Sequence, residues 1–328
     1  MKRRTLLSGS VGLAAATLLT QAGAQSSSYP NKPIKMIVPY PVGISPDVVA
    51  RMIAEKLGQA LGQPVIIDNR AGAGGMLGAE IAATTPADGY NLFFAVKAVM
   101  AIAPNVYPNV KYNPMRDFKG VGQILLVPHI LTATPNAPYN NMKELVEYAK
   151  RNPSKIDFAS LGVGSQPHVA VEAWASKLGI KLTHIPYKTN PSPDVMSGVV
   201  SLSLEASTTA IPLIKGGKIK ALAISGAERI PAMSEIPTMT EFGANLDANG
   251  VIGSSWHGIF TPTGTPDEIV SRLSAEIIKI VKTPEIQGKL KALGLTPTGM
   301  PGSVLTADVA TDYAFWGGLI KDLGVKVE

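Results

Sequence analysis

Short apolar runs alternate with stretches of helical periodicity along most of the chain. Early in the chain, the runs predict strands at 34–39, 65–68 and 92–96, and the periodic stretches predict helices at 48–62 and 76–83. The middle of the chain repeats this pattern, with elements expected at 141–151, 156–159, 165–178, 182–185, 202–205, 208–215 and 220–224. Strand–helix alternation of this kind implies α/β lobes with mostly parallel sheets.

The last part of the sequence departs from this alternation. Residues 266–320 are predicted to be largely helical, with breaks at Pro284 and near 294–301. Two extended segments, 121–134 with Pro128 inside it and 251–261, are interpreted as crossings between lobes. We therefore expect a discontinuous lobe I and a continuous lobe II, with boundaries at 25–127 plus 252–328 and at 128–251.

The first 24 residues have the features of an export signal. Lys2, Arg3 and Arg4 precede an apolar stretch, and Ala22-Gly23-Ala24 is typical of a cleavage site. The Arg3-Arg4 pair also fits a loose twin-arginine pattern, so both export routes stay open. We expect residues 1–24 to be a signal peptide and the mature protein to be periplasmic.

Charge and cysteine content exclude several classes of function. The chain has 30 basic and 24 acidic residues, and removing the three basic residues of the signal leaves 27 against 24. A net charge of +3 without a basic run does not indicate nucleic-acid binding. Cysteine is absent, so neither disulfides nor a lipidated cysteine are expected.

Motifs for nucleotides, catalysis and metals are weak. The glycines at 72–78 and 162–164 lack the third glycine of a dinucleotide fingerprint, and neither a P-loop nor a Gly-x-Ser-x-Gly elbow is present in the mature chain. His168 and Glu172 are four residues apart on one predicted helix, which alone makes a poor metal site. The other histidines, His129, His184 and His257, lie in separate segments. We expect no catalysis, no cofactor and no metal.

Two loops have the same plan. Residues 41–47 and 161–167 each follow an apolar run, contain glycine, and place a serine, Ser45 or Ser165, near the start of a predicted helix. Helix N-termini carry unpaired amides and partial positive charge, and they favour anions. The alternative is that both serines simply cap their helices. If the loops face one another across a cleft, they form a clamp for a small acid.

Seven segments resemble one known family in matching order, from about residue 29 to the C-terminus. They are YPNKPI (29–34), DNRAGAGG (68–75), ADGY (87–90), YNPMRDF (112–118), HIPYK (184–188), IPT (236–238) and WHGIFTP (256–262). The chain thus resembles the extracytoplasmic solute receptors of tripartite tricarboxylate transporters, the Bug or TctC family.

The resemblance implies a two-lobed periplasmic binding protein fold of type II topology, with a ligand cleft between the lobes. It implies an organic acid or amino acid as ligand and permease subunits in the membrane as partners, with the receptor itself expected to be a monomer. In the family, two loops equivalent to 41–47 and 159–168 hold the carboxylate through amides, hydroxyls and water. The residues expected at the ligand are Val42, Gly43, Ile44, Ser45, Asp47, Leu161, Gly162, Val163, Gly164, Ser165, Gln166, Tyr187, Asn190 and Glu205.

Departures from the family pattern suggest the ligand. Val42, Ile44, Leu161 and Val163 stand at positions that are usually small or polar, so the pocket is expected to be apolar. Lys97 replaces a usual Ser or Thr and is expected to meet a second carboxylate, unless it is a solvated surface lysine. These features favour an aromatic dicarboxylate such as terephthalate or phthalate.

Other ligands and roles stay open. An adipate-like dicarboxylate is the close alternative, and Glu205 fits a ligand amine instead. The expected mechanism is lobe closure around the acid, with hinges near Pro128 and Val251. A periplasmic enzyme of organic acids, or a sensor that docks on a histidine kinase, would need the same pocket.

Overall fold

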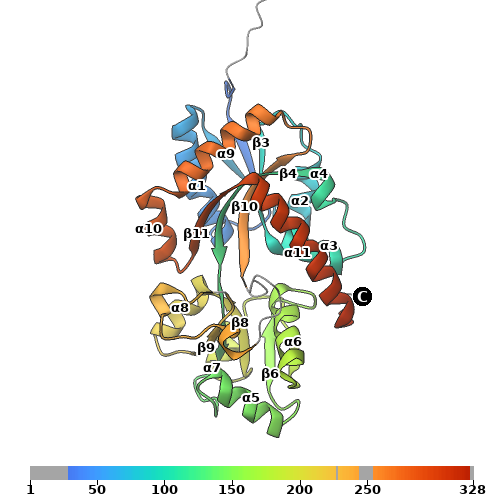
Figure 1. The fold of residues 1–328 in the computed structure, drawn as a ribbon, viewed down its shortest axis with the longest axis vertical. Helices are drawn as coiled ribbons and strands as arrows, with labels where there is room; N and C mark the ends of the chain where they lie inside the picture. The colour runs from blue at the N-terminus through green and yellow to red at the C-terminus, as the bar shows by residue number, and fades with distance from the viewer. Residues whose placement is uncertain (1–28, 227, 244–253, 326–328) are drawn as a thin grey trace, which may run out of the picture.

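The computed structural model describes residues 29–226, 228–243 and 254–325. The predicted signal peptide lies outside the described residues, as does the start of the second predicted crossing. Two lobes are stacked along the long axis of the molecule (Figure 1). Each lobe is built on one mixed sheet covered by helices, so the predicted two-lobed α/β fold is confirmed.

The lobe I sheet has the strand order β11-β4-β10-β3-β1-β2. Strands β1, β2 and β3 are parallel, whereas β10, β4 and β11 join as antiparallel neighbours. The strands are β1 (Ile34–Val38), β2 (Val65–Asn69), β3 (Asn91–Val96), β4 (Phe118–Val127), β10 (Ser255–Pro262) and β11 (Thr296–Pro301). Its helices are α1 (Ser45–Leu61), α2 (Met76–Ala83), α3 (Ala103–Val106), α4 (Pro114–Asp117), α9 (Asp267–Val281), α10 (Pro284–Ala292) and α11 (Gly302–Asp322), with short turns η1 (Ala73–Gly75) and η2 (Ala98–Ile102).

The lobe II sheet has the order β7-β6-β8-β5-β9. Here β6 runs parallel to β7 and β8, and β5 is inserted antiparallel between β8 and β9. The strands are β5 (His129–Ala133), β6 (Asp157–Ser160), β7 (Thr183–Pro186), β8 (Leu202–Ala206) and β9 (Lys220–Ile224). The helices are α5 (Met142–Arg151), α6 (Gln166–Leu178), α7 (Ser192–Ser197) and α8 (Ser207–Lys215), with η3 (Pro231–Met233) and η4 (Met239–Phe242).

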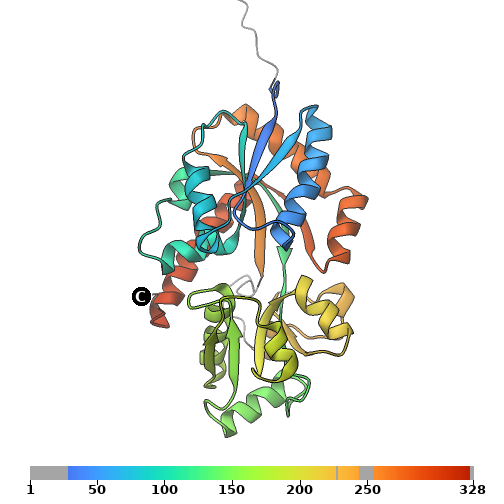
Figure 2. The ribbon, with the colours of Figure 1, turned by 180° about the vertical axis from the view of Figure 1, so that it is seen from behind.

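The chain passes between the lobes where strands of the two sheets nearly join. β4 of lobe I ends at Val127, and β5 of lobe II begins at His129, so Pro128 separates the two sheets. Proline lacks the amide that a ladder needs, which explains why one apolar run is divided here. The second passage precedes β10 and includes residues outside the described range. The view from behind shows the green chain from β4 to β5 passing between the two lobes (Figure 2).

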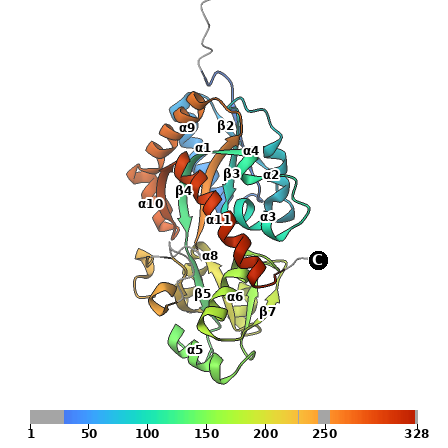
Figure 3. The same ribbon diagram turned by 45° about the vertical axis from the view of Figure 1, so that its right-hand side comes forward.

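α11 connects the lobes in a second way. It begins beside β4 in lobe I and ends beside α6 of lobe II (Figure 3). Trp316 and Ile320 near its end are buried in the same apolar cluster as Phe158, Leu202 and other lobe II residues. The C-terminal helix is therefore shared between the two cores, although its sequence position falls within predicted lobe I.

Most predicted elements are confirmed within one or two residues, but the short helices α3, α4 and α7 and one strand are missed. The expectation of mostly parallel sheets is wrong, because both sheets are mixed. Residues 294–301 were expected only to interrupt the helices, yet β11 forms an edge strand paired with β4. Pro297 and Pro301 hide this strand in the sequence, because proline is typical of turns and is tolerated only at sheet edges. None of the helices that the structure describes is long and apolar enough to cross a membrane.

Candidate functional site

A cavity of about 350 Å³ lies between the lobes. Its walls come from both: Tyr40, Ser45, Val96, Ser255 and His257 from lobe I, and His129, Leu161, Gly164, Ser165, Gln166 and Ala206 from lobe II, among others. No Lys or Arg is among the described residues that line it. The site can thus attract an anion only through backbone dipoles and neutral donors.

The first loop is held together by Asp47. Its carboxylate accepts hydrogen bonds from Gly43 N–H at 2.8 Å, from Arg51 Nε at 3.0 Å and from Asn69 Nδ2 at 2.8 Å. Burial acts to raise the pKa of this carboxyl, but the hydrogen bonds from Arg51, Gly43 and Asn69 outweigh it, so the pKa is lowered. Neither Asp47 nor Gly43, which has φ +88°, lines the cavity; their hydrogen bond fixes the loop that carries Ser45 and Pro46, which do.

The second loop rests on a pair of stacked histidines. The rings of His168 and His184 have centroids 3.8 Å apart, and burial lowers the pKa of each to about 4. Gly164 N–H donates to Nδ1 of His168 at 3.0 Å, which requires that nitrogen to be unprotonated. Ser160 Oγ donates to Gly162 O at 3.0 Å, so Nε2 of His184, 2.7 Å from the same hydroxyl, is the donor to it. A neutral pair therefore positions this loop.

The same loop is seated against lobe I. Gly164 has φ +76°, and a Cβ built there would lie 2.3 Å from Cγ1 of Val106 in α3. Glycine is required here for both reasons, because a left-handed φ and a close approach each penalise a side chain. The predicted anion loop of lobe II thus touches the opposite lobe directly.

Ser45 and Ser165 do not occupy equivalent places, contrary to their parallel positions in the two motifs. Ser165 is the N-cap of α6, and its hydroxyl accepts from His168 N–H at 3.4 Å. Ser45 is instead the first residue of α1, whose N-cap, Ile44, provides no side-chain cap. The true counterpart of Ser45 is Gln166, the first residue of α6. Each of the two is followed by a proline that also lines the cavity, Pro46 and Pro167.

Ser45 and Gln166 also share an unusual chemical state. Ser45 Oγ and Gln166 Nε2 are buried and have no hydrogen-bond partner within the described part of the chain. Buried donors are nearly always paired in native proteins, and leaving one unpaired costs about 1–3 kcal/mol. Both residues line the cavity, one from each lobe. They are donors available to a ligand acceptor.

A second compartment of about 330 Å³ continues the first. The two share His129, Leu161, Pro167 and Ala206, and the second adds Ile44, Ser160, Asn190, Pro191, Ser203, Leu204, Glu205 and Thr209. The cleft therefore has a donor end at the helix N-termini and an acidic end at Glu205, the penultimate residue of β8.

Four further predicted residues, Val42, Gly162, Val163 and Tyr187, do not line either compartment. Val42 is 67% exposed and Val163 is less so, and neither lines the described compartments. Gly162, at φ +106°, shapes the second loop rather than lining it. The hydroxyl of Tyr187 donates to Asp194 at 2.6 Å and thereby braces the segment that carries Asn190.

Lys97 lies away from the cleft. Its side chain is 0% exposed, and Nζ is 3.2 Å from Oδ2 of Asp312 in α11, to which Trp256 Nε1 also donates at 2.7 Å. Its neighbours Val96 and Ala98 line the cavity, and Lys97 projects to the other side, toward α11. It pairs with a carboxylate of the protein itself, neither with solvent nor with the cavity.

Two histidines of the cavity were not assigned from sequence. His129 lines both compartments, and His257 lines the first from β10. Burial, and after it the charge of His129, lowers the pKa of His257 to about 3, so this ring is neutral. The sequence did contain a signal for His257, because this residue lies in the segment interpreted as a crossing between lobes. A strand that crosses between lobes borders the cleft.

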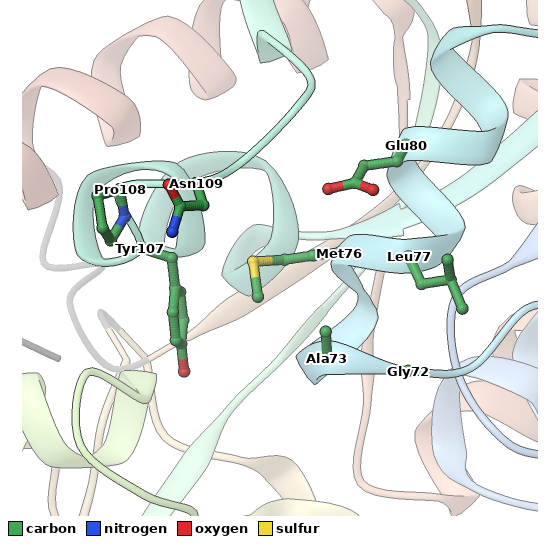
Figure 4. Close-up of a pocket in the computed structure, with 8 residues that line it drawn as sticks. All are labelled: Gly72, Ala73, Met76, Leu77, Glu80, Tyr107, Pro108 and Asn109. Atoms are coloured by element: carbon green, nitrogen blue, oxygen red, sulfur yellow. The ribbon is translucent and has the colours of Figure 1, made fainter. Parts of the chain in front are cut away.

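Another cavity, of about 450 Å³, is formed by lobe I alone between α2 and the segment after α3. Figure 4 shows Met76 and Tyr107 facing one another across it, with Glu80 at its upper side. Glu80 Oε1 accepts from Lys111 N–H at 3.4 Å. Because no lobe II residue lines it, this cavity is not expected to respond to lobe closure. No group of three potential metal-ligating side chains occurs among the described residues.

Comparison with known proteins assigns the chain to a family. The profile described as "Tripartite tricarboxylate transporter family receptor" matches residues 49–325. A UPF0065 protein from the tcbD-tcbE intergenic region of Pseudomonas sp. is 33% identical over 322 residues, covering 98% of this chain and 94% of that protein.

Solved structures agree with this assignment. An R. palustris protein with adipate has a TM-score of 0.80 and 30% identity, covering 91% of this chain and 99% of that one. MatC from Rhodopseudomonas palustris with bound malate has a TM-score of 0.75 and 28% identity, covering 89% and 100%. Fold and family are those of solute-binding receptors and not of enzymes. This chain belongs to the TctC family, the receptors of tripartite tricarboxylate transporters.

Proposed function

We propose that this protein captures an organic carboxylate in the periplasm and presents it to the membrane subunits of a tripartite tricarboxylate transporter. The observation that carries the proposal is a pair of buried donors without a partner among the described residues, Ser45 Oγ and Gln166 Nε2, on residues that line one cavity from two lobes. A carboxylate between them accepts from both and lies at two helix N-termini, where the helix dipoles favour negative charge. Because each lobe supplies one donor, only the closed form satisfies both.

The body of the ligand is expected to be apolar. Ile44 and Leu161 line the cleft beside the polar groups, and the first compartment adds Val96, Ala98 and Ile102. Burying apolar ligand surface against such walls yields roughly 25 cal/mol per Å². These walls support a ligand with an apolar body, aromatic as in terephthalate or aliphatic as in adipate. Two structural relatives hold adipate and malate.

The second carboxylate of the expected aromatic dicarboxylate no longer has a predicted binding partner. That expectation relied on Lys97, which is buried against Asp312. Neither compartment offers another Lys or Arg among its described lining residues. Terephthalate and adipate are therefore reference ligands, and only their first carboxylate is accounted for.

A differential thermal-shift screen followed by calorimetry tests this function. The purified mature protein is incubated with terephthalate, adipate, citrate, glutamate and nicotinate, alongside the uncharged amide of each acid. We expect stabilisation by acids with an apolar body and none by the amides, and the recovered acid should be chemically unchanged. Turnover of the acid, or equal binding of acids and amides, would contradict a carboxylate receptor.

Transport rather than sensing is proposed on family grounds. Co-purification with membranes that contain the permease subunits, in the presence and absence of ligand, distinguishes the two roles. Ligand-dependent capture of a histidine kinase in place of the permease would favour a sensor.

A further inference from the structure

Glu205 stands at the acidic end of the cleft without a full set of partners. It is 6% exposed and lines the second compartment. Oε2 lies 2.8 Å from Ser192 Oγ, whereas Oε1 is buried and receives no hydrogen bond from the described residues. A carboxylate has room for about four donors, so most of its acceptor capacity is unused.

The Ser192 hydroxyl, the donor to Glu205 Oε2, lies within hydrogen-bond distance of a second acceptor. Ser192 Oγ is 2.7 Å from Asn190 Oδ1 as well as 2.8 Å from Glu205 Oε2. A hydroxyl carries a single proton, so it cannot donate to both acceptors at once. Asn190 Oδ1 is fixed as an acceptor, because Ser192 N–H also donates to it at 3.0 Å. At any moment, therefore, at least one of Glu205 Oε2 and Asn190 Oδ1 lacks the proton of Ser192 Oγ.

The second compartment has one ionisable base in its described lining, His129, which also lines the first compartment. Among its described lining residues, the second compartment has neither Lys nor Arg, and Leu161, Pro167 and Leu204 make it largely apolar near the acid. Burial raises the pKa of Glu205, and the nearby hydroxyls of Ser192 and Ser203 offset this only in part. A second ligand carboxylate placed beside Glu205 would meet a like charge or a carboxylic acid.

We propose that the second compartment binds an ammonium group, so that the ligand is an amino acid whose amine is separated from its carboxylate by an apolar body. This rests on the proposed function, in which the carboxylate binds at Ser45 and Gln166. The ammonium donates to Oε1 of Glu205 and to whichever acceptor Ser192 leaves free. Leu161 and Pro167, which line both compartments, pack on the apolar body. An α-amino acid does not fit, because its ammonium lies beside its carboxylate.

Matched ligands that differ only at the far end test the inference. Adipate is compared with ε-aminocaproate, and terephthalate with para-(aminomethyl)benzoate, by calorimetry on the full mature chain near neutral pH. We expect the amino acid of at least one pair to bind about tenfold or more tightly than its dicarboxylate, as a charge-assisted hydrogen bond allows. Equal affinity within both pairs, or preference for the dicarboxylates, overturns the inference but leaves the carboxylate receptor standing.

Two variants locate the effect. Glu205→Gln keeps the shape of the side chain and removes its charge, and it is expected to lose the preference for the amine. Glu80→Gln, which neutralises an acid in the lobe I cavity, is the matched control and should retain it. A preference that survives Glu205→Gln overturns the assignment to this residue; if that variant does not fold, the wild-type comparison alone decides. Failure of all four ligands to bind would contradict the proposed function itself.

Discussion

Ser45 and Gln166 are equivalent residues of two helices that lie in different lobes. Each is the first residue of its helix, precedes a proline, lines the shared cavity, and carries a buried donor that has no partner among the described residues. The prolines lack an N–H, so fewer backbone donors are available at these helix starts, and the side chains become correspondingly more important. In the proposed carboxylate clamp, the side-chain donors are thus one hydroxyl and one amide.

Removal of either donor is expected to weaken ligand binding. Ser45→Ala and Gln166→Leu each delete a hydrogen bond to a charged acceptor, which is worth about 1.5–3 kcal/mol and corresponds to roughly a tenfold to hundredfold loss of affinity. Folding stability should not fall on account of the lost donor, because neither atom has a hydrogen-bond partner among the described residues. Calorimetry with a carboxylate that binds the wild type, together with urea unfolding, measures both effects.

Ser165→Ala is the matched control for this experiment. Ser165 caps α6, so its loss is expected to reduce the free energy of unfolding by about 1 kcal/mol and to affect affinity less than Gln166→Leu does. If Ser165→Ala weakens binding as strongly as Gln166→Leu, the assignment of Gln166 as the counterpart of Ser45 is wrong.

Periodicity was sufficient for most of the fold because each lobe buries its sheet by ordinary alternation. The strand β4 and the following β5 were even recognisable as one apolar run divided at Pro128. β11 was missed since an edge strand with two prolines has the composition of a turn. The sharing of α11 between lobes was also hidden, because Trp316 and Ile320 look like any buried helix positions until both lobes are placed.

For the site, the loops could be identified but not the direction of each side chain. Ser165 and Gln166 are neighbours in the sequence, and only the helix start distinguishes the cap from the ligand donor. Lys97 follows a strand whose end borders the cleft, and a one-residue difference in position turns it away from the cavity. Lys97 lies one residue beyond β3 and has helical φ and ψ of −47° and −45° at the start of η2, so strand alternation does not predict where its side chain points.

Lys97→Met is expected to destabilise the protein without affecting the ligand. The substitution removes the cation that faces Asp312, whose side chain is 14% exposed. The indole N–H of Trp256 still donates to that carboxylate. Breaking a buried ion pair from one side typically costs about 3 kcal/mol or more. Urea unfolding should show this loss, and ligand affinity at a temperature where the variant is folded should be unchanged within about threefold. A large loss of dicarboxylate affinity in the folded variant would instead indicate that Lys97 binds the ligand.

Gly164→Ala is expected to disturb the contact between the second loop and α3. The new Cβ would adopt a left-handed φ, which costs about 1–2 kcal/mol, and would collide with Val106. Gly43→Ala is the control, because its φ is also positive but its Cβ would meet nothing within 4 Å. Gly164→Ala should therefore lose more stability than Gly43→Ala.

The collision can be separated from the backbone strain by a double-mutant cycle. In a Val106→Ala background the obstructing methyl groups are absent, so Gly164→Ala should be less harmful than in the wild type. Unfolding free energies of the four proteins give the coupling energy directly. A coupling of zero would mean that the loop does not rest on α3 in solution.

Acid is expected to weaken the fold through the stacked histidines. The pKa values of His168 and His184 are lowered by burial from 6.5 to about 4 in the native state, so the unfolded chain takes up protons first as the pH falls. Their contribution to stability is complete above about pH 6.5, declines as the pH falls toward 4, and is lost below it.

His168→Asn offers an oxygen to Gly164 N–H in place of Nδ1 and does not titrate. Urea unfolding between about pH 7 and pH 4.5 should therefore show a shallower decline for His168→Asn than for the wild type. His257, with a pKa lowered to about 3, leaves a residual slope in both proteins. Identical slopes would show that the native protein does not hold His168 neutral, and the support proposed for the second loop would fail with it.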